Sequence, residues 1–220
     1  MAKIIPVKNG SKKGAITQKA AILFKEKGFN ATSMKDIAEA FGVEAPSLYN
    51  HINSKKEILQ EICFKIANLY TTHINKVEVS DLPVMKKLEL IIRFHIHMMF
   101  REYESVYISE HEWKHLPEPY LFNFKNQRKS YRTRLAEIVE QGITNNEFKK
   151  IDPYVAVLTI LSAIGGIENW QQSKKSITAR LLEENMVTIL IGGLKNNQYV
   201  SEPISDPVRL SKSKIINIQS

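Results

Sequence analysis

The chain has 220 residues, of which 43% are hydrophobic and 25% are charged. This composition is ordinary for a globular protein with a buried core and excludes a disordered, collagen-like or coiled-coil chain. The length allows one large domain or two small ones. The longest nearly unbroken apolar run, at residues 155–167, is too short to span a bilayer and contains two glycines, Thr159 and Ser162. We therefore expect a buried helix there and no membrane segment.

The net charge of +8 is concentrated toward the N-terminal end. Residues 1–60 contain ten Lys against five Asp or Glu, and so hold +5 of the total. A basic end on an otherwise nearly balanced chain favours a polyanionic partner, although an ordinary solvated surface predicts the same charge. No apolar signal segment follows Met1, and the lone Cys63 excludes an internal disulfide framework. We expect a cytoplasmic protein.

Apolar residues recur at helical spacing in nearly every segment after residue 11, and almost none alternate with period two. The sequence therefore predicts an all-α protein. Thr32 or Ser33 is the expected cap of the second helix, and Gly28 the stop of the first. The polar tail from Asn196 onward has little to bury, and we expect it to be loosely ordered. The predicted helices lie at 12–27, around 37–41, at 44–51, from 55 to about 77–81, and at 84–101, 104–115, 120–142, 153–170 and 177–194.

Residues 32–52 have the pattern of a helix-turn-helix, two short helices joined by a turn that contains Gly42. Pro46 suits the first turn of the second helix, where its missing N–H costs nothing. A helix that enters the major groove needs small or polar side chains at its N-terminal end and apolar ones behind. Leu48 and Ile52 are four residues apart and predict the inward face.

The stretch TSMKDIAEAFGVEAPSLYNHINSKKEIL at residues 32–59 closely resembles the N-terminal domain of the TetR family of bacterial repressors. The distinguishing parts are the Thr-Ser start, Ile-Ala before the turn glycine, Ser-Leu-Tyr-Asn-His in the second helix and Ser-Lys-Lys-Glu after it. Ile52 stands where many members have Phe, a conservative difference. The resemblance covers about residues 12–60. It implies a flexible segment at 1–11, a DNA-binding domain at 12–56, a helical ligand-binding and dimerisation domain at 57–195, and a tail at 196–220.

The resemblance and the helix geometry together predict which residues meet DNA. Ala45, Ser47 and Asn50 stand among the residues expected to read bases, with Glu44 and Lys35. We expect Tyr49, His51 and Lys55 to contact phosphates. Packing inside the small domain is an alternative role for the Tyr, and protein or RNA contact is an alternative role for the whole motif. The predicted set is Thr32, Ser33, Lys35, Glu44, Ala45, Pro46, Ser47, Tyr49, Asn50, His51 and Lys55.

Residues 111–115 match H-E-x-x-H, a pattern that on a helix places two zinc ligands on one face with a general base between them. The pattern raises the alternatives of a zinc-dependent hydrolase using His111, Glu112 and His115, and of a structural or regulatory metal. Pro117 and Pro119 end the helix just after this pattern, and no later helix offers an evident third ligand. We therefore favour a helix end at the surface or at a pocket rim. We expect no metal, no cofactor and no catalytic activity.

Residues 84–135 are unusually rich in His, Met and aromatic residues, which in a helical bundle form core more often than a ligand site. The TetR resemblance implies a small-molecule pocket in this region, whose occupant changes the separation of two DNA-binding heads. The predicted pocket residues are His95, Met98, Met99, Tyr103, Tyr107, Trp113, Phe124, Arg128, Tyr131 and Arg132.

The C-terminal layout further resembles TetR members that sense acyl-CoA thioesters. A long helix with several arginines and Tyr131 is followed by the segment 142–148, by Asp152-Pro153 and by Trp170. The basic side chains can meet the phosphates of CoA, or they can form an ordinary solvated helix face. Control of an efflux system in response to aromatic or cytotoxic ligands is the alternative. The basic cluster comprises Lys125, Arg128, Lys129, Arg132 and Arg134.

The last two predicted helices carry more apolar surface than one subunit can cover. The excess predicts an isologous two-fold dimer in which two helices from each chain form a four-helix bundle. Two symmetric heads predict a palindromic double-stranded operator. We expect a homodimeric repressor that a small-molecule effector releases from DNA. The predicted dimer residues are Val157, Leu161, Ile164, Gly165, Trp170, Leu182, Met186, Ile189 and Leu190.

Overall fold

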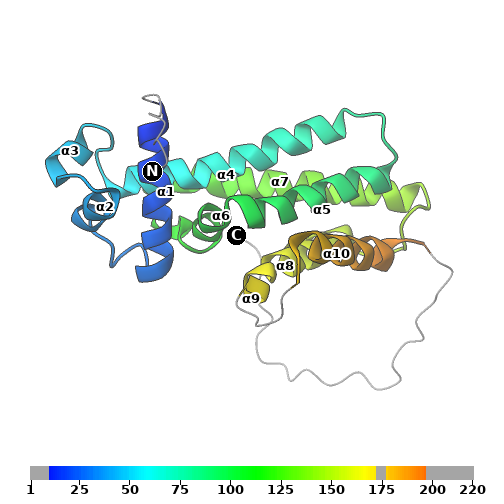
Figure 1. Ribbon diagram of the computed structural model, residues 1–220. Helices are drawn as coiled ribbons and strands as arrows, with labels where there is room; N and C mark the ends of the chain where they lie inside the picture. The colour runs from blue at the N-terminus through cyan, green and yellow to red at the C-terminus, as the bar shows by residue number, and fades with distance from the viewer. Residues whose placement is uncertain (1–9, 172–176, 197–220) are drawn as a thin grey trace, which may run out of the picture.

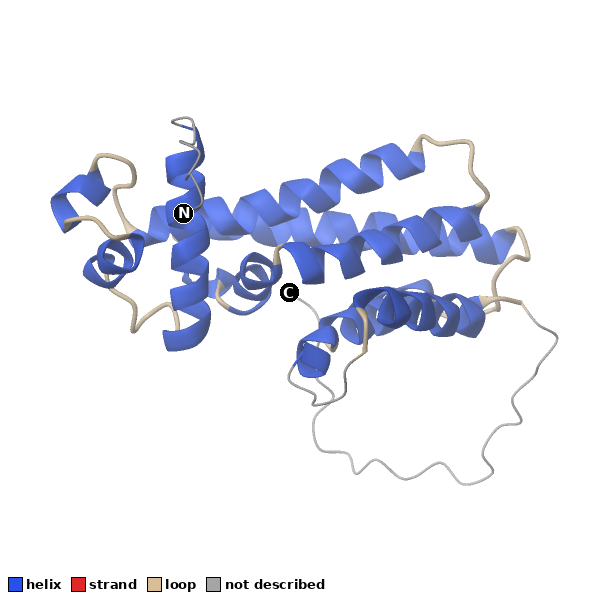
Figure 2. Cartoon of the chain, in the orientation of Figure 1, coloured by secondary structure: helices blue, strands red, loops and turns tan. Residues whose placement is uncertain are grey.

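The computed structural model describes residues 10–171 and 177–196, and within these ranges every regular element is helical (Figure 2). The predicted all-α class is confirmed. No helix within these two ranges is long and apolar enough to cross a membrane. The predictions for most of the N-terminal segment and for the tail beyond residue 196 lie outside the described residues.

Three helices form a small head at one end of the molecule (Figure 1). They are α1 (Gly10–Lys27), α2 (Met34–Phe41) and α3 (Ala45–Tyr49). Ser33 is the cap of α2, because its hydroxyl accepts from the Asp36 amide while the Asp36 carboxylate accepts from the Ser33 amide. Gly28 and Gly42 follow α1 and α2 at φ 85° and 80°, a left-handed conformation that favours glycine.

The body of the molecule consists of two helical layers (Figure 1). The first contains α4 (Lys55–Glu78), which extends out of the head, with α5 (Val84–Arg101), α6 (Tyr103–His111) and α7 (Tyr120–Thr144). The second contains α8 (Pro153–Gly165), α9 (Ile167–Gln171) and α10 (Ala179–Leu194), and it packs on α5 and α7. The predicted start of α8 is confirmed, since the Asp152 carboxylate accepts from the Val155 amide at 2.9 Å.

Three helix predictions were too long. The helix predicted at 104–115 ends at His111, and a separate 3-10 turn covers Trp113–His115. Leu116 precedes a proline and adopts the extended backbone that this position favours. The helix predicted at 153–170 is divided at Gly166 into α8 and α9, and the one predicted at 44–51 is the shorter α3.

The molecule has two hydrophobic cores that share α4. Ile58 and Ile62 belong to the core of the head, whereas Ile66 and Ile74 belong to the core of the body. Three buried residues of the later chain, Ile108, Leu116 and Phe124, also pack into the head core. The two cores therefore meet within α4, and residues of α6 and α7 pack directly into the head core.

Candidate DNA interface and effector pocket

Most side chains of the short helix α3 are exposed to solvent. Only Leu48 is buried in the head core, and Ala45 is half-buried. Tyr49 is 50% exposed, so the alternative that it packs inside the domain does not describe its position. This arrangement leaves one face of the head open for contact with a groove. The exposed predicted residues are Ser33 and Lys35 near the start of α2, and Glu44, Pro46, Ser47, Tyr49, Asn50 and His51 in and around α3.

Two residues of the predicted DNA set hold the head together instead. Thr32 is 1% exposed, and its hydroxyl donates to the Gly28 carbonyl at 2.9 Å. The Lys55 ammonium donates to the carbonyls of Phe29 at 2.8 Å, Asn30 at 3.1 Å and Thr32 at 2.9 Å. It also lies 4.7 Å from the centroid of the Phe29 ring. An ammonium has three donors, and here all three are used inside the protein, so Lys55 is not a free phosphate contact.

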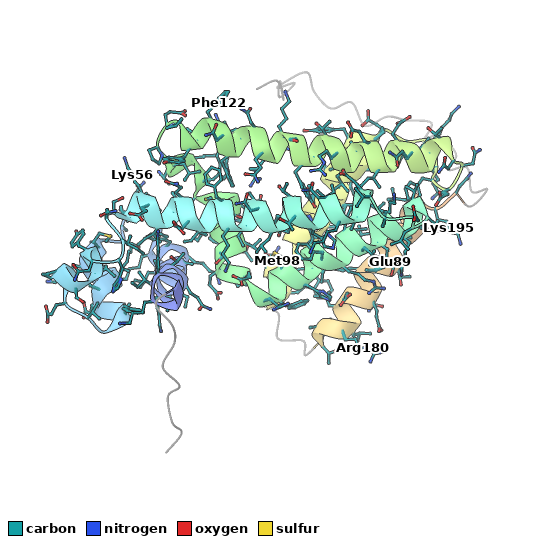
Figure 3. All side chains as sticks on the ribbon, turned by 90° about the horizontal axis from the view of Figure 1, so that it is seen from above. Lys56, Glu89, Met98, Phe122, Arg180 and Lys195 are labelled. Carbon is teal, nitrogen blue, oxygen red and sulfur yellow. The ribbon has the colours of Figure 1, made fainter. Side chains whose placement is uncertain are left out.

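The next residue, Lys56, is a lysine outside the predicted DNA set. It is exposed at the head end of α4 (Figure 3), and in the ranges 10–171 and 177–196 it has no hydrogen-bond or ion-pair partner. The helix start beside it is well capped, because Ser54 accepts from the Glu57 amide and Glu57 accepts from the Asn53 amide at 2.8 Å. That last hydrogen bond is the main reason that the pKa of Glu57 is lowered.

A cavity of about 420 Å³ lies in the body, bounded by residues of α4 to α9. Eight of the ten predicted pocket residues line it: His95, Met99, Tyr103, Tyr107, Phe124, Arg128, Tyr131 and Arg132. Met98 is instead buried in the body core. Trp113 packs behind the wall, with its ring 6.3 Å from that of Phe124. The sequence missed the contributions of α4 and α8 to the wall, which include Ile66, Tyr70, Leu158 and Leu161.

Arg128 and Arg132 border the cavity in different states. Arg128 forms a two-pronged ion pair with Glu110, at 3.0 and 2.6 Å, and also donates to the Ser109 carbonyl at 3.1 Å. Arg132 has a buried Nε without a hydrogen-bond partner, and no residue of the described chain forms an ion pair with it.

The other members of the predicted basic cluster lie away from the cavity. Arg134 pairs with Glu78 and Asn75 of α4. Lys125 and Lys129 are exposed on α7 and do not line the wall. The predicted cluster of five therefore contributes two side chains to the pocket.

A polar pair is buried in the cavity wall. His95 Nε2 and the Tyr131 hydroxyl are 2.7 Å apart, and both residues are buried. Burial lowers the pKa of His95 from 6.5 to about 3, so the imidazole is neutral at physiological pH. The Tyr70 ring stacks on His95 with centroids 4.1 Å apart, and burial raises the pKa of its hydroxyl and that of Tyr131.

The predicted dimer residues separate into inward and outward groups. Val157, Ile164 and Leu182 are buried within the subunit, and Leu161, Ile164 and Gly165 line the cavity. These five residues therefore serve the subunit's own core and pocket in the structure. Met186 and Leu190 are half-buried against the body core. The exposed apolar residues of this layer are Trp170 and Ile189 from the predicted set, together with Val155 and Leu181.

The H-E-x-x-H pattern does not form a helical zinc site. The helix ends at His111, whose Nδ1 lies 2.9 Å from the Tyr107 carbonyl and whose ring stacks on the Tyr107 ring. His115 stacks on Phe29 of the head, with centroids 5.2 Å apart, and contacts Glu112 at 3.3 Å. Within the residues that the structure describes, no three His, Cys, Asp or Glu side chains are grouped to hold a metal ion.

Two family models match the chain over the regions just described. Residues 16–62 match the model of bacterial regulatory proteins of the tetR family, and residues 81–194 match the tetracyclin repressor-like C-terminal domain. The second match alone spans more than half of the chain. The chain belongs to the TetR family. It is a DNA-binding transcriptional regulator with an N-terminal helix-turn-helix and a C-terminal helical domain.

Several relatives of this TetR-family protein are transcriptional repressors. KstR2 of Mycolicibacterium smegmatis is 22% identical over 200 residues, which are 90% of this chain and 98% of KstR2. IcaR of Staphylococcus aureus, a negative regulator of a biofilm operon, is 26% identical over 142 residues, 62% of this chain and 72% of IcaR.

Solved structures share the fold. KstR2 of Mycobacterium tuberculosis superposes with a TM-score of 0.79 at 22% identity, over 89% of this chain and 100% of that one. AibR in complex with isovaleryl coenzyme A and operator DNA superposes with a TM-score of 0.71 at 25% identity, over 82% and 98%.

In this TetR-family protein the cavity wall is in direct contact with the head. The Lys25 ammonium of α1 lies 3.9 Å from the centroid of the Tyr103 ring and 5.9 Å from that of Tyr107, and both tyrosines line the cavity. The stack of His115 on Phe29 forms a second contact between α6–α7 and the head. These contacts join α6 and the turn after it directly to the head.

Proposed function

We propose that the protein is a homodimeric repressor that leaves a palindromic operator when an anionic effector with an apolar body, an acyl-CoA thioester, enters the cavity. The observation that carries this proposal is the unpartnered Arg132 on the wall of an otherwise largely apolar cavity. A buried charged donor without an acceptor is costly. A carboxylate, phosphate or thioester oxygen would supply the missing acceptor.

The neighbouring ion pair supports an anionic effector as well. Arg128 lies one helical turn before Arg132 and is held by Glu110, a partner from the exposed surface of α6. A phosphate that competes for Arg128 would release Glu110 and loosen α6 from α7. The related AibR binds isovaleryl coenzyme A, which supports the thioester class for this chain.

The path from effector to DNA follows from the packing of α6. Tyr103 and Tyr107 form part of the wall and contact Lys25 of the head, so a ligand between α6 and α8 shifts the head relative to α4. The effector needs only to bind the released conformation more tightly. A 100-fold preference changes the equilibrium by about 2.7 kcal/mol, enough to empty an operator.

The exposed apolar residues of α8 and α10 support the two-fold dimer. Val155 is 60% exposed and Ile189 is 70% exposed, and Leu181 lies two helical turns before Ile189 on the same face of α10. The interface proposed here uses these residues and replaces Val157, Ile164 and Leu182 of the sequence prediction. Two heads related by this axis would read two half-sites on one side of the duplex.

The proposal is tested by measuring DNA binding with and without effector. Purified protein is titrated onto labelled DNA from the gene's own upstream region, and octanoyl-CoA is then added. We expect a specific, salt-sensitive complex that the thioester dissociates. Arg132→Gln is expected to need roughly 10- to 100-fold more thioester, since it loses a charge-assisted hydrogen bond.

The matched control is Lys129→Gln, because Lys129 is on the same helix but is exposed and does not line the cavity. It should respond to octanoyl-CoA like the native protein. A complex that ignores the thioester but dissociates with an aromatic cation would contradict the acyl-CoA proposal and support control by cytotoxic ligands.

A further inference from the structure

The cavity wall carries polar groups that an acyl chain does not need. We infer that Tyr70 and Tyr131 recognise a carbonyl oxygen within the apolar body of the effector, so that the protein selects an oxo-acyl thioester over the plain acyl thioester. This inference rests on the proposed effector class and adds the chemistry of the effector's body. It arises from three side chains, Tyr70, His95 and Tyr131, which we call the polar floor.

The Tyr70 hydroxyl is a donor without an acceptor. The ring is packed among aromatic rings, with its centroid 4.1 Å from that of His95, 5.9 Å from that of Tyr131 and 6.0 Å from that of Phe94. No hydrogen bond of the hydroxyl is formed with any residue in 10–171 or 177–196. Burial raises the pKa of this phenol, so it keeps its proton at physiological pH. Tyr70 is half-buried and lines the cavity, so a ligand in the cavity can supply the acceptor that its hydroxyl lacks.

The second donor comes from the buried pair of His95 and Tyr131. A single hydrogen lies in their 2.7 Å contact, and either His95 Nε2 or the Tyr131 hydroxyl donates it. A neutral imidazole has one N–H, so the tautomer of His95 decides which of the two is the donor. When His95 Nε2 donates to Tyr131, the phenolic hydrogen of Tyr131 is free to point into the cavity. His95 therefore acts as a positioning residue that sets which hydrogen Tyr131 offers.

A carbonyl oxygen is the acceptor that best fits this floor. It has two lone pairs for two phenolic donors and no hydrogen of its own to satisfy. An anionic oxygen is a poorer fit, since the imidazole of His95 in this part of the wall is neutral and the charge of Arg128, which acts on Tyr70, is already paired with Glu110. The cation is displaced from the floor, because Arg132 follows Tyr131 and successive residues on a helix point about 100° apart. One wall of α7 thus offers a charged donor to one end of the effector and neutral donors to its body.

The test compares thioesters that differ in one oxygen. Octanoyl-CoA is measured beside its 5-oxo, 6-oxo and 7-oxo derivatives by calorimetric titration of the full-length protein. We expect at least one oxo derivative to bind tenfold or more tightly than octanoyl-CoA. In Tyr70→Phe and in Tyr131→Phe this ratio should fall to within twofold of unity, while the affinity for octanoyl-CoA itself stays within threefold of native.

Tyr120→Phe is the control, because Tyr120 is on the same helix as Tyr131 but is exposed and does not line the cavity. It should keep the tenfold ratio. A change in packing alone would weaken all four thioesters equally and leave the ratio unchanged, so the ratio separates recognition from a structural role. Melting temperatures of the variants show that each one is folded.

Two outcomes overturn the inference, and they are distinguishable. If the thioesters bind to the native protein but with equal affinity, or if the ratio survives in both tyrosine variants, the polar floor does not read an oxygen and the proposed function stands. If no thioester binds at all, the effector class is wrong, and the inference falls with the proposed function.

Discussion

The head and the pocket differ in where their polar side chains without a hydrogen-bond partner lie. In the head, the side chains of Thr32 and Lys55 form internal hydrogen bonds, and the side chains of Ser47 and Lys56, which have no partner, are exposed to solvent. In the pocket, Arg128 is paired with Glu110, and the Nε of Arg132 is buried without a partner. Water satisfies an exposed donor at little cost, but an enclosed donor depends on a ligand.

This difference predicts how each region responds to change. Removal of an exposed lysine from the head should alter an electrostatic term that salt can also alter. Removal of a side chain that forms internal hydrogen bonds should instead lower the free energy of unfolding. In the pocket, the same kind of substitution should change which ligand is bound. The following experiments exploit this contrast, in order of decreasing effect.

The largest effect is expected where the body holds two heads together. Ile189→Asp places a charge on the most exposed apolar side chain of α10, and we expect it to yield monomers and to lower operator affinity by roughly 100-fold or more, since one half-site then binds without the other. Sedimentation and a DNA titration measure the two effects. Arg180→Ala, which removes only a surface pair with Glu184, should change neither; native-like dimers of Ile189→Asp would contradict the interface.

Lys55→Ala should destabilise the head. Three carbonyls at the end of α1 lose a charged donor, and we expect the free energy of unfolding to fall by about 2 kcal/mol. Chemical denaturation followed by circular dichroism measures this loss. A variant that unfolds like the native protein but binds DNA weakly would contradict this role and indicate that Lys55 contacts phosphate.

His95 makes the stability of the pocket depend on pH. The unfolded chain takes up a proton at this residue near pH 6.5, whereas the folded protein does so only near pH 3. Stability contributed by the neutral form is therefore lost as the pH falls below 6.5, by about 2 kcal/mol between pH 7 and pH 5. His95→Asn should reduce the difference between urea unfolding at these two pH values by that amount. An identical difference in the variant would mean that His95 is accessible to protons in the folded state.

The smallest effect is expected at Lys56. Lys56→Ala should weaken operator binding a few-fold at low salt and reduce the salt dependence by about one ion, with no change in thermal stability. The weakening should be the same for all DNA sequences, because a phosphate contact carries no base information. Loss of preference between operator and random DNA would instead indicate a base contact.

Sequence reasoning succeeded where the signal is local. The cap at Thr32 or Ser33, which the structure assigns to Ser33, the stop at Gly28, the turn at Gly42 and the start at Asp152-Pro153 each depend on a few adjacent residues, and the structure contains all of them. The exposure of α3 also followed from its own spacing, with Leu48 as the inward residue. These features require no knowledge of the rest of the chain.

It failed where distant segments decide. Lys55 and Lys56 are identical and adjacent, and only the carbonyls of residues 29–32 distinguish them. Ile164 was expected at a dimer interface because α8 is apolar on most sides, yet one of those sides forms the cavity wall. His115 completes a metal motif in the sequence but stacks on Phe29 in space. In each case the deciding contact joins residues that are far apart in the chain.

The proposed coupling between the cavity and the DNA face is most directly measured from the effector side. Octanoyl-CoA is titrated into the free protein and into the protein saturated with its operator. Linkage requires that the operator weakens thioester binding by the same factor by which the thioester weakens operator binding. We expect the two factors to be equal and to be 10 or more. The same thioester affinity with and without operator would contradict it.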